Sequence, residues 1–346
     1  MSDPAEYDVA VVGGGPAGLT AALYTTRLGH DTVVINRGGG RAAMMADTHN
    51  VVGITEDVSG NEFLGTAIEQ IEGYGADYHQ DFVTGIERVD GPREFHVAAN
   101  STTALADRVV LATGFSDEHP DPPLPRTGRG LHYCLHCDAY MFVDERVYVM
   151  GHGESAAHVA MIMLNFTDEV DLLLRGHEPE WSAETDRQVR AHPVEIIEAE
   201  IDSKFADEQR EGWLGGFEFA DGSRREYKGG FGMYGSNYNT DLAESLGCEL
   251  TDDGTIAVDD HGRTSAEGVY AVGDVTPGHN QIPVAMGQGA KAGLDVHYEL
   301  RRFPMSIEEL DAAGEIDSSD VPAISERLRS RAASRAGGTD EAVGDD

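Results

Sequence analysis

Residues 7–18 have the sequence YDVAVVGGGPAG, in which a valine-rich stretch leads directly into a glycine-rich turn. The apolar run at 7–13 is typical of a short buried strand. The stretch LTAALYTTRLG that follows is typical of a helix ending at Gly29. A second apolar run at 32–35 comes at once. The pattern predicts a βαβ unit with the glycine motif at its strand-to-helix turn.

The glycines have the spacing that a bound pyrophosphate requires. Gly13 permits the tight turn, Gly15 lets the backbone approach the phosphates, and Gly18 lets the helix lie close to the strand. The helix N-terminus then attracts negative charge. The predicted dinucleotide-binding residues of this motif are Gly13, Gly15, Pro16, Ala17 and Gly18. Asn36 replaces the acid that usually follows the second strand, and its amide can also bond a ribose hydroxyl.

A weaker copy of the pattern lies in mid-chain. A strand-like run at 146–150 leads into GHGESA, a helical stretch and another strand at 169–174. A 2′-phosphate would need several guanidinium groups here, and Arg175 stands beside Glu178 and Glu180. The motif leaves open a nicotinamide site or a retained fold with a degraded site. The tentative NAD(P)-binding residues are Gly151, Gly153, Glu154, Ser155, Ala156 and Arg175.

Two such units predict an α/β protein with two Rossmann-like, three-layer nucleotide-binding domains, the second inserted into the first. A proline-rich stretch at 119–126 and a glycine-rich stretch at 229–239 are interpreted as the crossings between them. The predicted first domain is formed by residues 1–117 and 244–304, and the second by 118–243. Residues 305–346 are expected to form a C-terminal extension with a flexible tip.

The chain of 346 residues carries 62 acidic and 25 basic residues, a formal charge of −37. Such a field repels phosphate, so nucleic acid and anionic membranes are poor partners. Only three lysines occur, which favours adaptation to high salt over a specific cationic partner. No run reaches the roughly eighteen apolar residues of a membrane span, and the acidic N-terminus does not resemble a signal peptide. A cytoplasmic location is therefore expected.

Two of the three cysteines lie in the sequence Cys134-Leu135-His136-Cys137. A CxxC beside nucleotide-binding folds is typical of a redox dithiol, because the spacing permits a tight disulfide. Zinc is the competing interpretation, but it would need two further ligands, and no second CxxC or spaced histidine pair exists. No metal site is therefore predicted. The remaining cysteine, Cys248, is expected to be inert.

Read in order, the motifs resemble those of the low-molecular-weight thioredoxin reductases. They are VVGGGPAGLTAALYTTR, GGRAAMM, HNVVG, LATG, GRGLHYCLHCDAY, GHGESA and GVYAVGDV followed by NQIPVAMGQGAKAG. The resemblance covers roughly residues 7–303, nearly everything before the extension. The CxxC-D placed just before the second glycine motif is its most specific feature.

The resemblance implies that FAD lies across the first domain with its pyrophosphate at Gly13–Gly18. Asp274 would bond the ribityl and phosphate region, while Gln281 and the following helix would cover the flavin ring. Gly39, Gly40 and Asn50 would line the other side of the flavin. The further FAD-binding residues that it implies are Asn36, Arg41, Thr113, Gly114, Gly273 and Ile282.

The resemblance also implies roles at the dithiol. Cys137 would receive electrons from the flavin, Cys134 would attack a partner's disulfide, and Asp138 would be the acid–base group, unless it is only a helix-capping or surface acid. Electrons would pass from NADPH or NADH through FAD to thioredoxin or a similar small redox protein. The family's habit is a homodimer, whose domains would rotate about hinges near 115–120 and 240–245.

Two alternatives remain open at this stage. Relatives with a degraded nicotinamide site are fed by ferredoxin or act as flavin dithiol oxidases. A non-catalytic flavin- or nucleotide-binding sensor on the same fold is the third interpretation, against which the intact CxxC argues.

Overall fold

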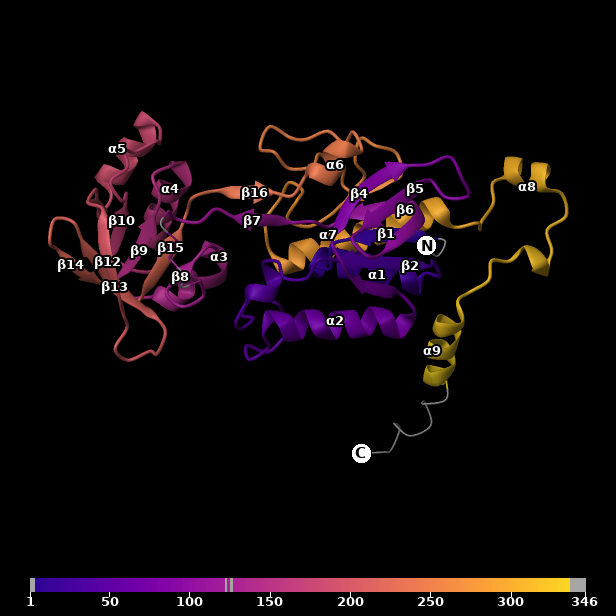
Figure 1. Cartoon of the computed structure of the whole chain (residues 1–346), viewed down its shortest axis with the longest axis horizontal. Helices are drawn as coiled ribbons and strands as arrows, with labels where there is room; N and C mark the ends of the chain where they lie inside the picture. The colour runs from indigo at the N-terminus through magenta and orange to yellow at the C-terminus, as the bar shows by residue number, and fades with distance from the viewer. Residues whose placement is uncertain (1–3, 122, 125–126, 337–346) are drawn as a thin grey trace. The chain divides into compact units, whose positions relative to one another are not determined.

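The computed structural model describes residues 4–121, 123–124 and 127–336. The described chain divides into two compact units (Figure 1). Unit 1 contains the residues up to Phe115 and those from Tyr238 onward, and unit 2 contains Ser116–Asn237. From the sequence, the boundary at which the chain returns to the first domain was predicted between residues 243 and 244. In the structure this point lies inside α6 (Asp241–Ser245), which belongs to unit 1.

Unit 1 is built on a sheet in which β3, β2, β1 and β6 lie side by side, with β17 also paired to β6. These five strands are parallel, and the β4–β5 hairpin adds an antiparallel edge. The predicted βαβ unit is present as β1, α1 and β2. The strands are β1 (Ala5–Val12), β2 (Thr32–Asn36), β3 (Asp77–Gln80), β4 (Val83–Arg88), β5 (Phe95–Ala99), β6 (Thr103–Leu111) and β17 (Val269–Ala271).

The two faces of this sheet bury alternate residues of β1. Val9 and Val11 pack under the helices α1 (Pro16–Arg27), α2 (Gly60–Tyr74) and α7 (Ile282–Leu300). Ala10 and Val12 face the other side, where the hairpin and α6 cover them. The period of two in a strand produces this division. The result is the three-layer arrangement predicted for a nucleotide-binding domain.

Helices α1 and α7 are in close contact. A Cβ added to Gly289 would lie 2.2 Å from the carbonyl oxygen of Ala17, and one on Gly293 would lie 2.9 Å from that of Ala21. The matched order of these contacts means that the helices run parallel. Since Gly289 lies seven residues after the start of α7, α7 begins about two turns before it meets α1.

Unit 2 repeats the three-layer plan. Its parallel sheet has the order β11-β10-β9-β15-β8, and an antiparallel sheet of β12, β13 and β14 covers one face. Helices cover the other face. The strands are β8 (Leu131–His132), β9 (Val147–Met150), β10 (Val170–Leu173), β11 (Val194–Ile197), β12 (Ile201–Ala206), β13 (Leu214–Phe219), β14 (Arg224–Glu226) and β15 (Gly229–Gly232). The helical segments are α3 (Leu135–Asp138), the short helix η2 (Ala139–Phe142), α4 (Glu154–Met163) and α5 (Ala183–Ala191).

The first four residues of the glycine-rich stretch 229–239 do not cross between the two units. This corrects the interpretation made from the sequence. Residues Gly229–Gly232 form β15, a fully buried strand between β9 and β8. A Cβ on Gly229 would lie 2.7 Å from the ring of Phe142, so this glycine makes room for a neighbouring side chain. The crossings themselves pair as a ribbon of β7 (Phe115–Asp117) and β16 (Ser236–Tyr238). Of the proline-rich stretch, residues 122, 125 and 126 lie outside the described residues.

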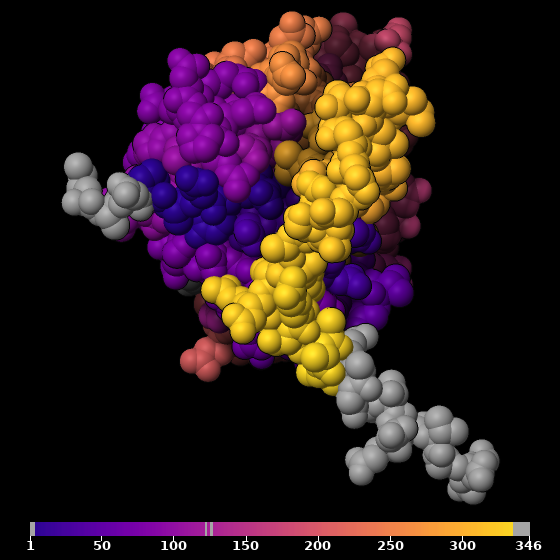
Figure 2. All heavy atoms as spheres, turned by 90° about the vertical axis from the view of Figure 1, so that its right-hand side faces the viewer, coloured from indigo at the N-terminus to yellow at the C-terminus, as the bar shows by residue number. Residues whose placement is uncertain are grey.

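The C-terminal extension contains α8 (Ile307–Ala313), η3 (Ser318–Asp320) and α9 (Glu326–Ala336). Figure 2 shows it as a yellow band in front of unit 1, and its last helix, α9, contacts α2. Arg327 anchors its end, donating a 2.8 Å hydrogen bond to Asp77 at the start of β3. The predicted flexible tip, residues 337–346, lies outside the described residues. No helix in the described part of the chain has both the length and the apolar character needed to cross a bilayer.

Candidate active site

Cys134 and Cys137 form a disulfide, with their Cα atoms 5.3 Å apart. Cys134 caps the start of α3, and its carbonyl oxygen accepts hydrogen bonds of 3.3 Å from the amides of Cys137 and Asp138. Both cysteines are partly exposed, as a sulfur pair that exchanges with another molecule must be. Among the described residues, no group of three or more His, Cys, Asp and Glu side chains gathers in a way that could hold a metal ion.

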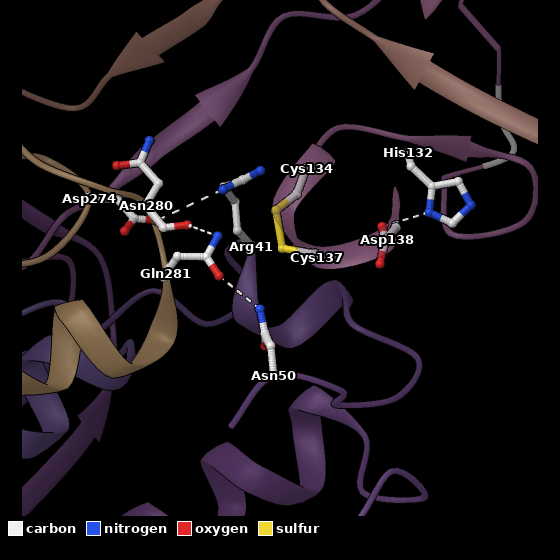
Figure 3. The surroundings of a disulfide bond; sticks show 9 residues. All are labelled: Arg41, Asn50, His132, Cys134, Cys137, Asp138, Asp274, Asn280 and Gln281. Carbon is white, nitrogen blue, oxygen red and sulfur yellow. Dashed lines mark hydrogen bonds and ion pairs between the residues drawn. A yellow bond between two sulfur atoms is a disulfide. The ribbon is translucent and has the colours of Figure 1, made fainter. Parts of the chain in front are cut away.

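Asp138 forms an ion-pair-like contact with a residue that the sequence did not point to. His132, the last residue of β8, lies with Nδ1 2.7 Å from Oδ2 of Asp138 (Figure 3). Its side chain is only 5% exposed, whereas that of Asp138 is 22% exposed. The sequence did not predict His132 as a partner of Asp138, because nothing local links a strand residue to the end of the next helix. The one signal that the sequence offered was the position of His132, two residues before Cys134.

The first glycine loop fits a phosphate group. Gly13 has a φ of +110°, and a Cβ there would lie 2.2 Å from the carbonyl oxygen of Ala112. Around Gly15, by contrast, an added Cβ would meet nothing within 4 Å. No side chain caps the start of α1, and its first turn carries no acid. The backbone amides of this turn can therefore bind an anion.

Asn36 lies at the end of β2, beside this loop. A Cβ on Gly14 would come within 2.7 Å of its side chain. Its amide nitrogen donates a 3.0 Å hydrogen bond to the hydroxyl of Tyr78 on β3. Tyr78 thereby fixes the orientation of the amide group, and the role of Asn36 toward a ribose hydroxyl stays a prediction.

Two further segments of unit 1 that carry predicted FAD-binding residues contact each other. Arg41 lies 3.9 Å from Asp274, and Nδ2 of Asn50 donates a 2.8 Å hydrogen bond to Oε1 of Gln281 (Figure 3). Gln281 precedes Ile282 at the start of α7, another helix N-terminus with no side-chain cap and no acid in its first turn. These contacts bring the loop after β2 to the segment between β17 and α7.

Gly273 and Gly40 both have a positive φ, of +79° and +92°. The amide of Gly273 donates a 2.8 Å hydrogen bond to the side chain of Gln288 on α7. A Cβ on Gly273 would lie 2.8 Å from Cβ of Ala17, so the Gly273-Asp274 turn packs directly against the start of α1.

Thr113 and Gly114 follow β6 and are bonded to the returning chain. The hydroxyl of Thr113 donates to the carbonyl oxygen of Asn239 at 2.8 Å. The side-chain amide of Asn239 donates to the carbonyl oxygens of Thr113 and Gly114 at 2.9 and 3.1 Å. These bonds join the segment by which the chain leaves unit 1 to the segment by which it returns. Sequence reasoning did not identify Asn239.

The second glycine loop keeps the backbone of a dinucleotide fold. Gly151 has a φ of +148°, and a Cβ there would lie 2.9 Å from Cβ of Ala156. Gly153 precedes α4 with nothing within 4 Å of an added Cβ, and Ser155 is exposed. The carboxylate of Glu154 accepts hydrogen bonds from the amide of Ser182 at 2.5 Å and from the hydroxyl of Thr185 at 2.7 Å. These bonds lower the pKa of Glu154.

The residues after β10 do not gather cations around this loop. Arg175 lies with one guanidinium nitrogen 3.4 Å from the hydroxyl of Tyr234. The rings of His152 and His177 stack with their centroids 4.7 Å apart. Glu180 lies 3.6 Å from Nε2 of His152, so an acid stands close to the second glycine loop.

Cys248 is buried in unit 1, where its sulfur lies 3.4 Å from the hydroxyl of Thr264. Burial raises the pKa of this thiol. Because the thiolate is the reactive form, Cys248 is a poor nucleophile, in agreement with the expectation from sequence.

Comparisons with known proteins place these features in a family. A family model described as pyridine nucleotide-disulphide oxidoreductase matches residues 7–289. The thioredoxin reductase of Bacillus subtilis is 30% identical over 321 residues, covering 90% of this chain and all of the relative. The thioredoxin reductase of Listeria monocytogenes is 30% identical over 312 residues, covering 87% of this chain and 96% of that protein.

Solved structures agree with the sequence matches. Thioredoxin reductase from Streptococcus pyogenes superposes with a TM-score of 0.78 at 28% identity, covering 87% of this chain and 100% of that one. HlmI superposes with a TM-score of 0.78 at 28% identity, covering 97% and 98%. The predicted fold and enzyme class are thereby confirmed. The chain belongs to the pyridine nucleotide-disulphide oxidoreductase family, and it is a thioredoxin reductase-like oxidoreductase.

Proposed function

We propose that this enzyme carries electrons from FAD in unit 1 to the Cys134–Cys137 disulfide in unit 2, and on to the disulfide of thioredoxin or a similar small redox protein. The observation that carries the proposal is the partly exposed disulfide at the start of α3, with Asp138 directly after it. The acceptor class is supported by the named relatives, since three of the four are thioredoxin reductases.

The residues of unit 1 fit FAD. The open loop at Gly15 and the uncapped start of α1 suit its pyrophosphate. Asp274, Asn50 and Gln281 converge from two chain segments, which supports their assignment around the ribityl chain and the flavin ring. FAD would supply the two-electron chemistry that protein side chains lack.

The cysteines would divide the exchange chemistry. After reduction of the disulfide, the Cys134 thiolate attacks a sulfur of the partner's disulfide and forms a mixed disulfide, and one partner sulfur leaves. Cys137 then attacks Cys134, which re-forms the internal disulfide and releases the second partner sulfur. Asp138 holds the proton that Cys137 gains on reduction and loses on attack.

The electron donor is a separate part of the proposal. NADPH is the donor that the sequence resemblance implies, with NADH as the variant, and the backbone of the second glycine loop suits a dinucleotide. A second candidate function, a reductase or dithiol oxidase that does not use nicotinamide, is favoured by a specific observation. Glu154 occupies the first turn of α4, Glu180 lies beside His152, and Arg175 is the sole arginine predicted there, all of which disfavour a 2′-phosphate.

A rotation between the units would let one dithiol serve the flavin and a protein substrate in turn. The two-stranded ribbon of β7 and β16 is the proposed hinge, because both chain crossings run through it. A disulfide engineered across this ribbon should slow turnover while leaving the FAD content unchanged. Unchanged turnover would remove the rotation from the proposal.

Three further expectations stay proposals. A homodimer and a cytoplasmic location follow from the family alone. Adaptation to high salt follows from the charge of −37.

The proposed function is tested by anaerobic rapid mixing of the FAD-loaded enzyme with NADPH and, separately, with NADH. Loss of the flavin absorbance, followed by reduction of added oxidised thioredoxin, supports the first candidate. Flavin that neither nucleotide reduces, but that dithiothreitol reduces through the disulfide, supports the second. The Cys134→Ser variant is the matched control, because it should bind FAD normally and transfer no electrons to thioredoxin. Thioredoxin reduction by this variant would contradict both candidates.

A further inference from the structure

We propose that His132 is a positioning residue for the acid–base group at the dithiol. It holds Oδ2 of Asp138 through a hydrogen bond from Nδ1 and leaves Oδ1 to exchange a proton with Cys137. The inference rests on the proposed thiol–disulfide chemistry, and it adds a residue to which neither the family match nor the named relatives assign a role.

The position of His132 is fixed by the sheet. It ends β8 and lies opposite Phe231 of β15 in the parallel register. Its ring packs edge-on to Phe142 at a centroid distance of 5.4 Å and lies 6.1 Å from the ring of Phe231. Both phenylalanines are fully buried. His132 therefore has little freedom to move, and Figure 3 shows its ring directed at Asp138.

Asp138 lies on the same short helix as Cys137. It ends α3 and directly follows Cys137, so the 2.7 Å bond to His132 connects the rigid sheet to the helix that carries the sulfurs. A carboxylate on its own at the end of a four-residue helix can rotate about its side-chain torsions. The bond from His132 selects one orientation, which is the condition for efficient proton transfer.

The surroundings of the other ring nitrogen determine what His132 can do. Nε2 of His132 is buried and has no hydrogen-bond partner among the described residues. A neutral ring with its proton on Nδ1 leaves only a bare acceptor in this apolar pocket. The other tautomer would bury an N–H donor at Nε2 with nothing to accept its hydrogen bond, which costs more. His132 therefore donates to Asp138, and the exchanged proton is held by Asp138 itself.

The proton and electrons balance in this scheme. Bound FAD would supply the two electrons that break the Cys134–Cys137 bond. Oδ1 of protonated Asp138 would then give its proton to the Cys137 sulfur, while Cys134 remains a thiolate. When Cys137 later attacks the mixed disulfide, its proton returns to Asp138. His132 neither gains nor loses a proton, and its bond to Oδ2 persists throughout.

The test uses a single turnover that does not depend on the natural donor. FAD-loaded enzyme is reduced with stoichiometric dithionite and mixed with increasing oxidised thioredoxin, and the return of the flavin absorbance is followed. His132→Leu removes the donor but keeps an apolar side chain. His132→Asn keeps an amide N–H near the position of Nδ1 but cannot act as a base. His192→Leu, a change at an exposed histidine after α5, is the matched control.

We expect His132→Leu to lower the limiting rate by about 5- to 20-fold with a half-saturating thioredoxin concentration within about 2-fold of the wild type. His132→Asn should recover the rate to within about 3-fold, and FAD content should match the wild type in all variants. A wild-type rate for His132→Leu would overturn the inference, and so would a His132→Asn rate as low as that of His132→Leu, because the ring itself would then be the base. Wild-type enzyme that transfers nothing to thioredoxin would overturn the proposed function as well.

Discussion

Asn50 and Gln281 are 231 residues apart in sequence, yet the side-chain amide of Asn50 donates a 2.8 Å hydrogen bond to Oε1 of Gln281. The bond ties the loop after β2 to the residue that precedes α7. Both residues were predicted to lie on the flavin, and the contact explains how the two segments are held in register within unit 1.

Breaking this contact should weaken FAD binding. In Asn50→Ala, Oε1 of Gln281 loses the hydrogen bond from the Asn50 amide, at a cost of about 0.5–1.5 kcal/mol, or roughly 2- to 10-fold in the dissociation constant. The dissociation constant is measured by titrating the apoprotein with FAD while the flavin fluorescence is monitored. Asn61→Ala, an exposed change in the first turn of α2, should leave the affinity unchanged. Equal affinity of the Asn50 variant and wild type would place the flavin away from this pair.

The tight fit of β15 predicts a loss of stability on adding one methyl group. Gly229→Ala would put a Cβ 2.7 Å from the ring of Phe142, which in turn packs against His132. We expect the free energy of unfolding to fall by about 1–3 kcal/mol. Gly85→Ala in β4, where an added Cβ meets nothing within 4 Å, is the control. The midpoints of urea denaturation of the two variants are compared. Equal midpoints would mean that β15 can accommodate a methyl group at Gly229.

Much of the architecture could be predicted because its signals are local. The valine run, the glycine motif and the following helix lie within one stretch of about thirty residues, so β1, α1 and β2 were found. Gly229–Gly232 was misread as a crossing because its glycines make room for residues of other elements, such as the ring of Phe142 at Gly229 and Tyr148 at Gly230. Glycine in a sequence indicates space or a turn without distinguishing them.

The candidate site shows the same limit. The CxxC and Asp138 are adjacent in sequence and were predicted together. His132 was missed as their partner because its contact depends on the path of the chain from β8 into α3. Likewise, no local pattern shows that Glu154 is bonded to Ser182 and Thr185, which lie 28 and 31 residues further along the chain.

The bonds to Glu154 make a prediction about pH. Its pKa is lowered in the folded state, first by the hydrogen bond from the Ser182 amide. The resulting stabilisation is present above pH 4.5, the ordinary pKa of a glutamate in the unfolded chain. It is lost as the pH falls through the lower folded-state pKa. Glu154→Gln should therefore destabilise the protein at about pH 7, by an amount that shrinks below about pH 4.5. Denaturation midpoints across this range test it, with the exposed Glu178→Gln as a control that should show no such trend.

The formal charge of −37 predicts a stability that depends on salt. Raising KCl from about 0.1 to 1 M shortens the screening length from about 10 to 3 Å, which weakens repulsion among the surface carboxylates. The thermal midpoint should rise by several degrees over this range. An equal rise on adding an uncharged osmolyte of the same osmolality would show that screening is not the cause. A midpoint that salt leaves unchanged would contradict the proposed adaptation.

The central claim is that one flavin and one reducible sulfur pair exchange electrons within this chain. Anaerobic titration of the FAD-loaded protein with dithionite measures the capacity directly. The account predicts about four electrons per FAD for the wild type, two for the flavin and two for the Cys134–Cys137 disulfide, and about two for Cys134→Ser. A wild-type capacity of about two electrons per FAD would contradict the account.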